Sequence, residues 1–203
     1  MNIEIKISKE LIPYKYAIKC LKRRVDSLKV GKNKELLWIL EHPTTFTAGI
    51  RSEKKEILDK KIKIINTNRG GKITYHNPGQ KIIYFVLNLN KRKKDIRLLV
   101  EKIEKSIIQF LKLYKIKSKS DKKNIGIWVN KKKIAAIGIK VSGWIAYHGC
   151  SINIKNNLTG YKKIIPCGLS NNKVTSMYVE KRKKFYDIDK NLEKKLIKNL
   201  KEI

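Results

Sequence analysis

Two stretches of the 203-residue chain have side chains of the types and spacing that covalent chemistry uses. One is a turn in which Cys167 stands between Pro166 and Gly168, and the other is the polar, glycine-rich stretch 69–80. Pro166 fixes its own φ, and Gly168 lets the backbone approach a bound group closely, so this turn can present a sulfur to a pocket. A cysteine between proline and glycine is equally typical of a buried, unreactive thiol. The choice depends on what could activate it.

A cation beside Cys167 would favour the thiolate, which is the nucleophilic form of a cysteine. The sequence offers His76, His148 and Lys133 as candidates. Lys133 is the last residue before the apolar run 134–138, so its side chain can turn inward. Loss of water favours the neutral amine of a lysine, which can then act as a base. The residues alone do not choose among these three candidates.

The stretch 69–80 contains Arg69, His76 and three glycines, and it lies between two expected strands. Such a loop can wrap a ligand with its backbone N–H groups. It lacks the Lys-Ser/Thr ending of a phosphate-binding P-loop, and its glycine spacing does not fit the dinucleotide-binding fingerprint. A single Arg-Gly-Gly is not an RNA-binding repeat. The alternative to a ligand loop is a tight turn that needs glycine for its dihedral angles.

The formal net charge of +32 raises the possibility of nucleic-acid binding through phosphate neutralisation. However, the lysines are spread over almost every segment, as in a solvated surface coat. Such a surface still steers acidic macromolecules toward the protein, and an acidic carrier protein meets this description as well as RNA does. We therefore do not expect nucleic acid to be the partner.

The chain begins with alternating apolar and charged residues, and it has no apolar run of the ~20 residues that a membrane span needs. We expect a cytoplasmic protein without membrane contact. The three cysteines, Cys20, Cys150 and Cys167, have no CxxC spacing, so neither a disulfide framework nor a zinc site is indicated.

Hydrophobic periodicity predicts alternating strands and helices. We expect helices over 17–28, from a cap at Asp95 to Tyr114, and over 189–200. The expected strands are 2–8, 36–41, 62–65, 81–89, 125–129, 134–141 and 144–154. Residues 44–49 and 115–124 are expected to be loops, and 130–133 a hairpin turn, while 172–179 is ambiguous. No linker divides the chain. These elements predict one α+β domain over residues 1–203, with a mixed sheet and flanking helices.

Several of these stretches together resemble the lipoyl(octanoyl) transferase family, the lipoate-protein ligase B type of octanoyltransferase. They are LLWILEHPTTFTAG at 36–49, RGGKITYHNPGQ at 69–80, KIAAIGIKVSGWIAYHGCSINI at 133–154, IIPCG at 164–168 and VTSM at 174–177. The resemblance spans nearly the whole chain. It implies an α/β domain similar to the catalytic domain of biotin and lipoate protein ligases.

In this family an octanoyl group is transferred from octanoyl-acyl carrier protein to a lysine of a lipoyl domain, the first step of endogenous lipoate synthesis. The acceptors are lipoyl domains of 2-oxoacid dehydrogenase complexes and the glycine cleavage H protein. The resemblance places the nucleophile on Cys167, which would carry the acyl group as a thioester, and the lysine that favours its thiolate on Lys133. It implies no metal and no cofactor, and we expect a monomer. The implied substrate contacts are Arg69, Gly70, Gly71, Lys72, Ile73, Thr74, Tyr75, His76, Ala136, Ile137, Gly138, Gly149, Cys150 and Ser151.

Two positions depart from the family pattern. Asn77 stands where the family usually has glycine, and Cys150 stands where it has another residue. Asparagine tolerates positive φ better than most residues, so the loop need not be disrupted. Cys150 would be a second thiol near the pocket. Three alternatives stay open: an ATP-dependent lipoate or biotin ligase, a nucleic-acid-binding protein, and a relative that keeps the fold without catalysis.

Overall fold

The computed structural model describes residues 2–166 and 173–203. Its centre is a seven-stranded sheet in which only the pairing of β1 with β2 is parallel. In spatial order its strands are β1 (Ile3–Leu11), β2 (Glu35–Glu41), β6 (Gln80–Asn88), β10 (Ile145–Asn153), β9 (Lys132–Ser142), β8 (Ile127–Val129) and β7 (Lys119–Ser120). A second, three-stranded sheet has the order β4 (Ile64–Asn66), β3 (Thr45–Ala48), β5 (Ile73–His76).

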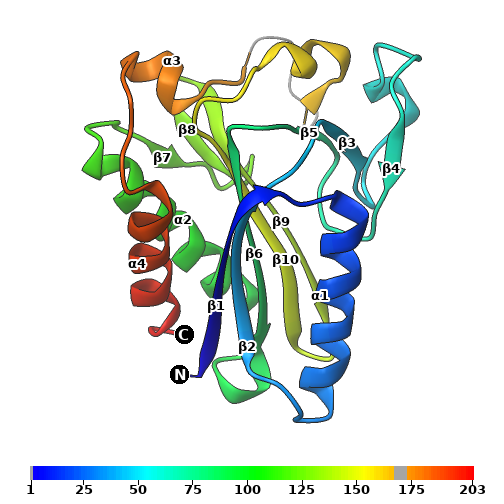
Figure 1. The fold of residues 1–203 in the computed structure, drawn as a ribbon, viewed down its shortest axis with the longest axis vertical. Helices are drawn as coiled ribbons and strands as arrows, with labels where there is room; N and C mark the ends of the chain where they lie inside the picture. Colours follow the sequence, from blue (N-terminus) through cyan, green and yellow to red (C-terminus); the bar gives the residue numbers. More distant parts are fainter. Residues whose placement is uncertain (1, 167–172) are drawn as a thin grey trace.

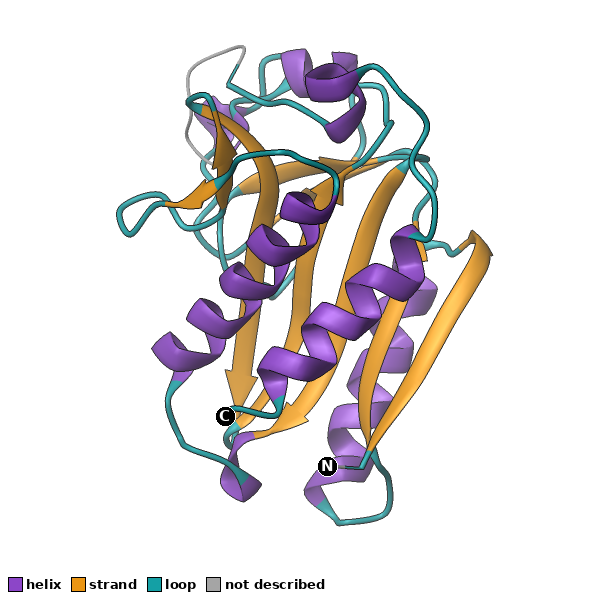
Figure 2. Ribbon diagram, turned by 90° about the vertical axis from the view of Figure 1, so that its left-hand side faces the viewer, coloured by secondary structure: helices purple, strands orange, loops and turns teal. Residues whose placement is uncertain are grey.

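Helices cover both faces of the large sheet (Figures 1 and 2). Alternating residues of each strand point to opposite faces, so neighbouring apolar residues of β2 serve two different cores. Trp38 packs with α1 on one face, and Leu37 and Ile39 pack with α2 and α4 on the other. The helices are α1 (Tyr14–Lys29), α2 (Ile96–Leu113), α3 (Met177–Lys181) and α4 (Ile188–Leu200), with short 3₁₀ turns η1 (Lys54–Glu56), η2 (Leu89–Lys91) and η3 (Thr159–Lys163).

The predicted fold class is confirmed, since the structure is a mixed sheet with flanking helices. The predicted cap is also present, because the Asp95 carboxylate accepts a hydrogen bond of 2.9 Å from the Leu98 N–H at the start of α2. No helix among the described residues is long and apolar enough to cross a membrane.

Four local predictions were wrong. The stretch 69–80, expected to be a loop between two strands, contains strand β5. Residues 44–49, expected to be a loop, contain strand β3, whose partners β4 and β5 follow much later in the chain. The expected connector 115–124 contains the short strand β7. The hairpin turn is shorter than 130–133, because only Asn130 and Lys131 take the positive φ values of the turn, and Lys132 already begins β9.

The central strand pair β6–β10 depends on a glycine. A Cβ built on Gly149 of β10 would lie 1.9 Å from the carbonyl oxygen of Ile83 in β6, far inside van der Waals contact. Any side chain here forces the two backbones apart.

We predict that Gly149→Ala lowers the free energy of unfolding by about 3 kcal/mol, because the added methyl overpacks a buried strand pair. Gly31→Ala is the matched control, since Gly31 has a φ of +71° but no atom within 4 Å of its built Cβ. That change should cost only about 1 kcal/mol of backbone strain. Urea unfolding of both variants measures the difference, and equal losses would contradict the close approach at Gly149.

Candidate functional site

A cavity lies over the α1-facing side of strands β9 and β10, and small residues form its floor. Ala136 and Gly138 of β9 are paired with Ser151 and Gly149 of β10, respectively. Paired residues point to the same face of a sheet, so both pairs contribute to one surface. Because none of the four has a bulky side chain, the cavity can extend down to the backbone of the sheet.

The loop at 69–72 forms the roof of this cavity. Its backbone lies directly against β9, since a Cβ on Gly70 would be 2.7 Å from the carbonyl oxygen of Ile139, and a Cβ on Gly138 would be 3.1 Å from the carbonyl oxygen of Gly70. A side chain at Gly70 would collide with the strand, and a side chain at Gly138 would be in tight contact with the loop. The sequence predicted a loop over 69–80; the structure agrees for 69–72, whereas residues 73–76 form strand β5.

Arg69 anchors the roof to the small sheet. Its Nη2 donates to the carbonyl oxygen and the Oγ1 of Thr47 at 2.8 and 2.9 Å, and its Nη1 donates to the carbonyl oxygen of Gly70 at 3.0 Å. Thr47 is completely buried. A side chain on Gly49 would collide with this arrangement, because its Cβ would lie 2.8 Å from the Arg69 Nη1.

Most of the residues that the family resemblance implied as substrate contacts line this one cavity. They are Arg69, Gly70, Gly71, Lys72, Thr74, His76, Ala136, Ile137, Gly138, Gly149, Cys150 and Ser151. The structure places the other two, Ile73 and Tyr75, elsewhere. They alternate with Thr74 and His76 along β5 and pack into a separate apolar cluster with Phe46 and Ile164.

Four further lining residues were not among the predicted contacts: Tyr14, Ile82, Tyr84 and His148. Ile82 and Tyr84 occupy the same sheet face as the small residues, because they are paired with Ser151 and Gly149. They are identified by the register of β6 on β10, which could not be predicted from the sequence. His148 was predicted to be an activator of the thiol or a packing residue, and Tyr14 had no signal beyond its place before an amphipathic segment.

The histidines at the cavity are neutral. Burial lowers the pKa of His76 to about 3 and the pKa of His148 to about 4. Burial also lowers the pKa of the neighbouring His42 to about 4. His76 is hydrogen-bonded to Gln80 Oε1 at 2.7 Å, and His42 to the Tyr84 hydroxyl at 2.8 Å. The His76 ring stacks on Tyr14 and meets His42 edge to face, so neutral rings form this side of the cavity.

Cys150 is a poor candidate for a nucleophile. It is 5% exposed, and burial raises the pKa of its thiol to about 12. At pH 8 only about one molecule in ten thousand would hold a thiolate there. Gly149 and Ser151 face the cavity, so the thiol of Cys150 between them points to the other face of the sheet, into the core with α2 and α4.

Asn77 does not use the positive φ that its replacement of a glycine suggested. In this turn the left-handed residue is Gly79, with a φ of +86°. The Asn77 amide instead donates to the carbonyl oxygen of Asn157 at 3.0 Å, and its oxygen accepts from Asn156 at 3.1 Å. The substitution thus ties the turn to the segment that follows β10.

Lys133 lies at a second, small cavity that adjoins the first. Thr74, Ala136 and Ser151 line both, so the two are separated by single side chains. Lys133 is 7% exposed, its Nζ donates to the carbonyl oxygen of Ile125 at 3.1 Å, and it lies 5.1 Å from the centre of the Trp128 ring. None of the ion pairs found within residues 2–166 and 173–203 includes Lys133.

A glycine makes room for this lysine. Gly126 has a φ of +139°, and a Cβ built there would lie 3.0 Å from the Lys133 Cε and 3.3 Å from its Nζ. The inward turn of Lys133 that the sequence suggested is therefore what the structure shows.

Cys167 and Gly168 lie outside the described residues. The described residues on either side of this range, Pro166 and Lys173, lie near Lys133. Pro166 lines the same small cavity as Lys133, and the Lys133 N–H donates to the carbonyl oxygen of Lys173 at 2.6 Å. The chain thus leaves and re-enters the described structure beside this lysine. Among the described residues no group of three His, Cys, Asp or Glu side chains could hold a metal ion.

The chain matches a family model and many known proteins. The family model is described as the lipoyl protein ligase A/B catalytic domain, and the match covers residues 13–196. An octanoyltransferase of Wolbachia pipientis wMel is 46% identical over 176 residues, which is 84% of this chain and 86% of that protein. An octanoyltransferase of Anaplasma phagocytophilum strain HZ is 39% identical over 205 residues, covering 98% of this chain and 99% of its own.

Among solved structures, lipoate-protein ligase A bound with ATP superposes with a TM-score of 0.77, covering 98% of this chain and 86% of the ligase chain. Its sequence identity is 13%, so this likeness shows a shared fold and nothing about the reaction.

The neutral histidines lead to a prediction about stability and pH. Their pKa values are lower in the folded state than the unfolded value of about 6.5, so the unfolded chain binds more protons below that pH. The part of the free energy of unfolding that depends on neutral histidines is therefore fully present above pH 6.5 and is lost as the pH falls toward 4. We predict that each histidine lowers the free energy of unfolding at pH 5 by up to about 2 kcal/mol relative to pH 7.5. Urea unfolding at these two pH values measures the drop.

His148→Gln provides the control, because glutamine cannot titrate and can still bond to Asn68, the present partner of His148 Nε2 at 2.8 Å. The drop between pH 7.5 and 5 should be smaller in this variant by about 2 kcal/mol. A drop equal to that of the unchanged protein would show that His148 does not titrate as described.

Proposed function

The chain belongs to the lipoyl protein ligase A/B catalytic domain family and is an octanoyltransferase of lipoate synthesis, and from this premise we propose how it moves the octanoyl group. The donor is octanoyl-acyl carrier protein, and the acceptor is a lysine of a lipoyl domain. The acceptor proteins are 2-oxoacid dehydrogenase complexes and the glycine cleavage H protein. Cys167 carries the acyl group between them as a thioester. Residues 1–203 act as a single catalytic domain, as a monomer in the cytoplasm.

One observation supports this assignment more than any other. Lys133 and Pro166, the residue before Cys167, line one small cavity, and that cavity adjoins the cavity beneath the Arg69 loop. A candidate base, the residue before the candidate nucleophile and a cavity with a floor of small residues are therefore adjacent. The position of Lys133 among apolar residues, with no carboxylate paired to it in the described structure, suits a group that takes up and releases a proton.

In the first half-reaction, the neutral amine of Lys133 takes the proton from the Cys167 thiol. The thiolate attacks the thioester carbonyl of the donor, the bond from that carbon to the carrier thiol breaks, and the departing thiolate takes the proton from Lys133. Because one thioester replaces another, this step is nearly balanced in free energy. The donor is already an activated acyl group, so the scheme uses no nucleotide.

In the second half-reaction, the amine of the acceptor lysine attacks the acyl-enzyme. A C–N bond forms, the bond from the carbonyl carbon to the Cys167 sulfur breaks, and Lys133 carries the proton from the amine to the sulfur. The thiol and the neutral Lys133 are restored. The product is an octanoyl amide on the acceptor.

The cavity beneath the Arg69 loop holds the octanoyl chain in this proposal. Its floor of Ala136, Gly138, Gly149 and Ser151 leaves room for an unbranched chain, and its histidine wall is neutral. At about 0.8 kcal/mol for each buried CH₂, such a chain contributes roughly 5 kcal/mol to binding. One methylene changes binding by only about 1 to 3 kcal/mol, so a closed end of the cavity is needed to reject longer chains.

Two neighbouring lysines test the role of the base. Lys133 is buried, whereas Lys132 is exposed on the same strand. We predict that Lys133→Met lowers the rate of octanoyl transfer by at least about 100-fold, because general-base catalysis is worth about that much, and that Lys132→Met stays within about twofold. The assay supplies octanoyl-acyl carrier protein and a purified lipoyl domain without ATP, and counts the octanoylated acceptor by mass.

Equal rates in the two variants would contradict the role of Lys133. Transfer by the unchanged protein that needs free octanoate and ATP would instead identify an acyl-adenylate ligase. Far-UV circular dichroism and thermal unfolding of both variants show whether a loss of transfer reflects a loss of folded protein.

A further inference from the structure

The cavity beneath the Arg69 loop is called the acyl cavity below. Residues 49–59 form a bracket, a segment that connects the roof of the acyl cavity to the chain that leads into Cys167. On one side, the N–H of Ile50 donates to the carbonyl oxygen of Arg69 at 3.1 Å, and that of Arg51 donates to the carbonyl oxygen of Gly71 at 3.1 Å. On the other side, the N–H of Leu58 donates to the carbonyl oxygen of Lys163 at 3.0 Å. The bracket therefore touches two parts of the site that are nearly 100 positions apart in the sequence.

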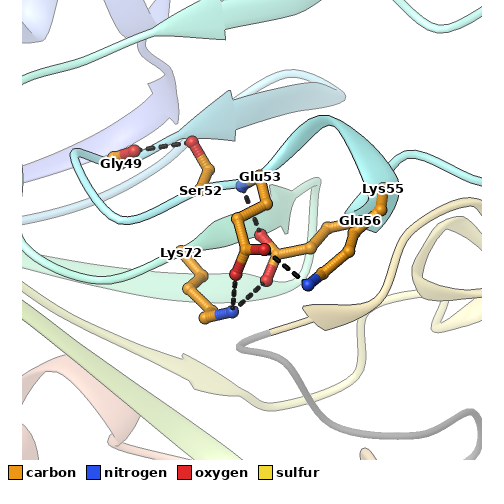
Figure 3. A network of polar contacts seen from close by, with 6 residues as sticks. All are labelled: Gly49, Ser52, Glu53, Lys55, Glu56 and Lys72. Atoms are coloured by element: carbon orange, nitrogen blue, oxygen red, sulfur yellow. Dashed lines mark hydrogen bonds and ion pairs between the residues drawn. The ribbon is translucent and has the colours of Figure 1, made fainter.

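Glu56 lies between these two sets of contacts, and Figure 3 shows its carboxylate beside Lys72. Its carboxylate accepts a hydrogen bond of 2.6 Å from Lys72 Nζ, and Lys72 lines the acyl cavity. Its main-chain carbonyl oxygen accepts a hydrogen bond of 2.8 Å from the N–H of Ile165, two positions before Cys167. One residue thus holds the cavity roof through its side chain and the cysteine segment through its backbone.

Burial makes this contact stiffer than a surface ion pair. The side chain of Glu56 is 2% exposed, and the side chain of Lys72 is 30% exposed. The second carboxylate oxygen of Glu56 accepts from the N–H of Glu53 at 3.1 Å, which closes the turn η1 on itself. A buried carboxylate whose oxygens both accept hydrogen bonds has little freedom to move.

Glu53 provides the comparison within the same network. It also binds Lys72, at 2.9 Å, and its second oxygen pairs with the exposed Lys55 at 2.6 Å. Its side chain is 45% exposed, and none of its contacts reaches residues 163–165. Glu53 and Glu56 therefore share a cationic partner, but only Glu56 connects that partner to the cysteine segment.

We infer that Glu56 is a positioning residue for acyl transfer: its ion pair with Lys72 and its bond to Ile165 hold the roof of the acyl cavity and residue 165 in a fixed relation. This inference rests on the proposed role of Cys167. The reason it matters is geometric, since a displacement of about 1 Å between a reacting atom and its bound substrate can cost about 100-fold in rate. Glu56 touches neither the substrate nor the thiol in this scheme, so its loss changes the reaction step more than it changes donor binding.

The test compares Glu56→Gln with Glu53→Gln, two substitutions of the same type around the same lysine. Each protein is mixed with octanoyl-acyl carrier protein, quenched in acid, and analysed by intact mass for the rate of acyl-enzyme formation in a single turnover. We expect Glu56→Gln to lower the rate at saturating donor by roughly tenfold, with the half-saturating donor concentration within about twofold. Glu53→Gln should leave both quantities within about twofold of the unchanged protein.

Three results would overturn the inference. Unchanged rates in Glu56→Gln would show that the contact does not position the site. A raised half-saturating concentration at an unchanged maximal rate would show that Glu56 acts on donor binding through Lys72. Equal losses in both variants would show that only neutralisation of Lys72 matters. Thermal unfolding above the assay temperature confirms that each variant is folded, and an unchanged protein that forms no acyl-enzyme would instead refute the role of Cys167 itself.

Discussion

The close contact between the loop at 69–72 and strand β9 is the constraint on which the site depends. The backbones meet where Gly70 faces Ile139 and Gly138; a Cβ on Gly70 would collide with the strand, and a Cβ on Gly138 would be in tight contact with the loop. The Arg69 guanidinium fixes the loop at this distance by hydrogen bonds to the buried Thr47. A narrow slot between a backbone roof and a floor of small residues follows from that contact.

Local sequence signals were sufficient for the fold class. Alternation in the strands and the stripe of apolar residues in α2 are properties of neighbouring residues, and so is the cap at Asp95. They failed for β3 and β5 of the small sheet, because these are strands of four residues whose pairing depends on segments distant in the sequence. The same is true of β7, which has only two residues.

The site could be located from sequence only through the family resemblance, because its parts come from distant segments. Burial of Lys133 and its approach by Pro166 depend on tertiary contacts that no local pattern encodes. Alternation along β5 would have excluded Ile73 and Tyr75 had that segment been read as a strand. Ile82 and Tyr84 required the register of β6 on β10, and Glu56 required a fold that brings residues 56, 72 and 165 together.

The central claim is that the acyl group rests on Cys167, and intact-mass measurement after mixing with octanoyl-acyl carrier protein tests it most directly. The account predicts one octanoyl adduct, mapped by digestion at low pH to the peptide that contains Cys167 and absent from Cys167→Ala. An adduct on the peptide of Cys150, or an adduct that persists in Cys167→Ala, would contradict it. The thiol of Cys150, whose pKa burial raises to about 12, gives the physical reason to expect the first result.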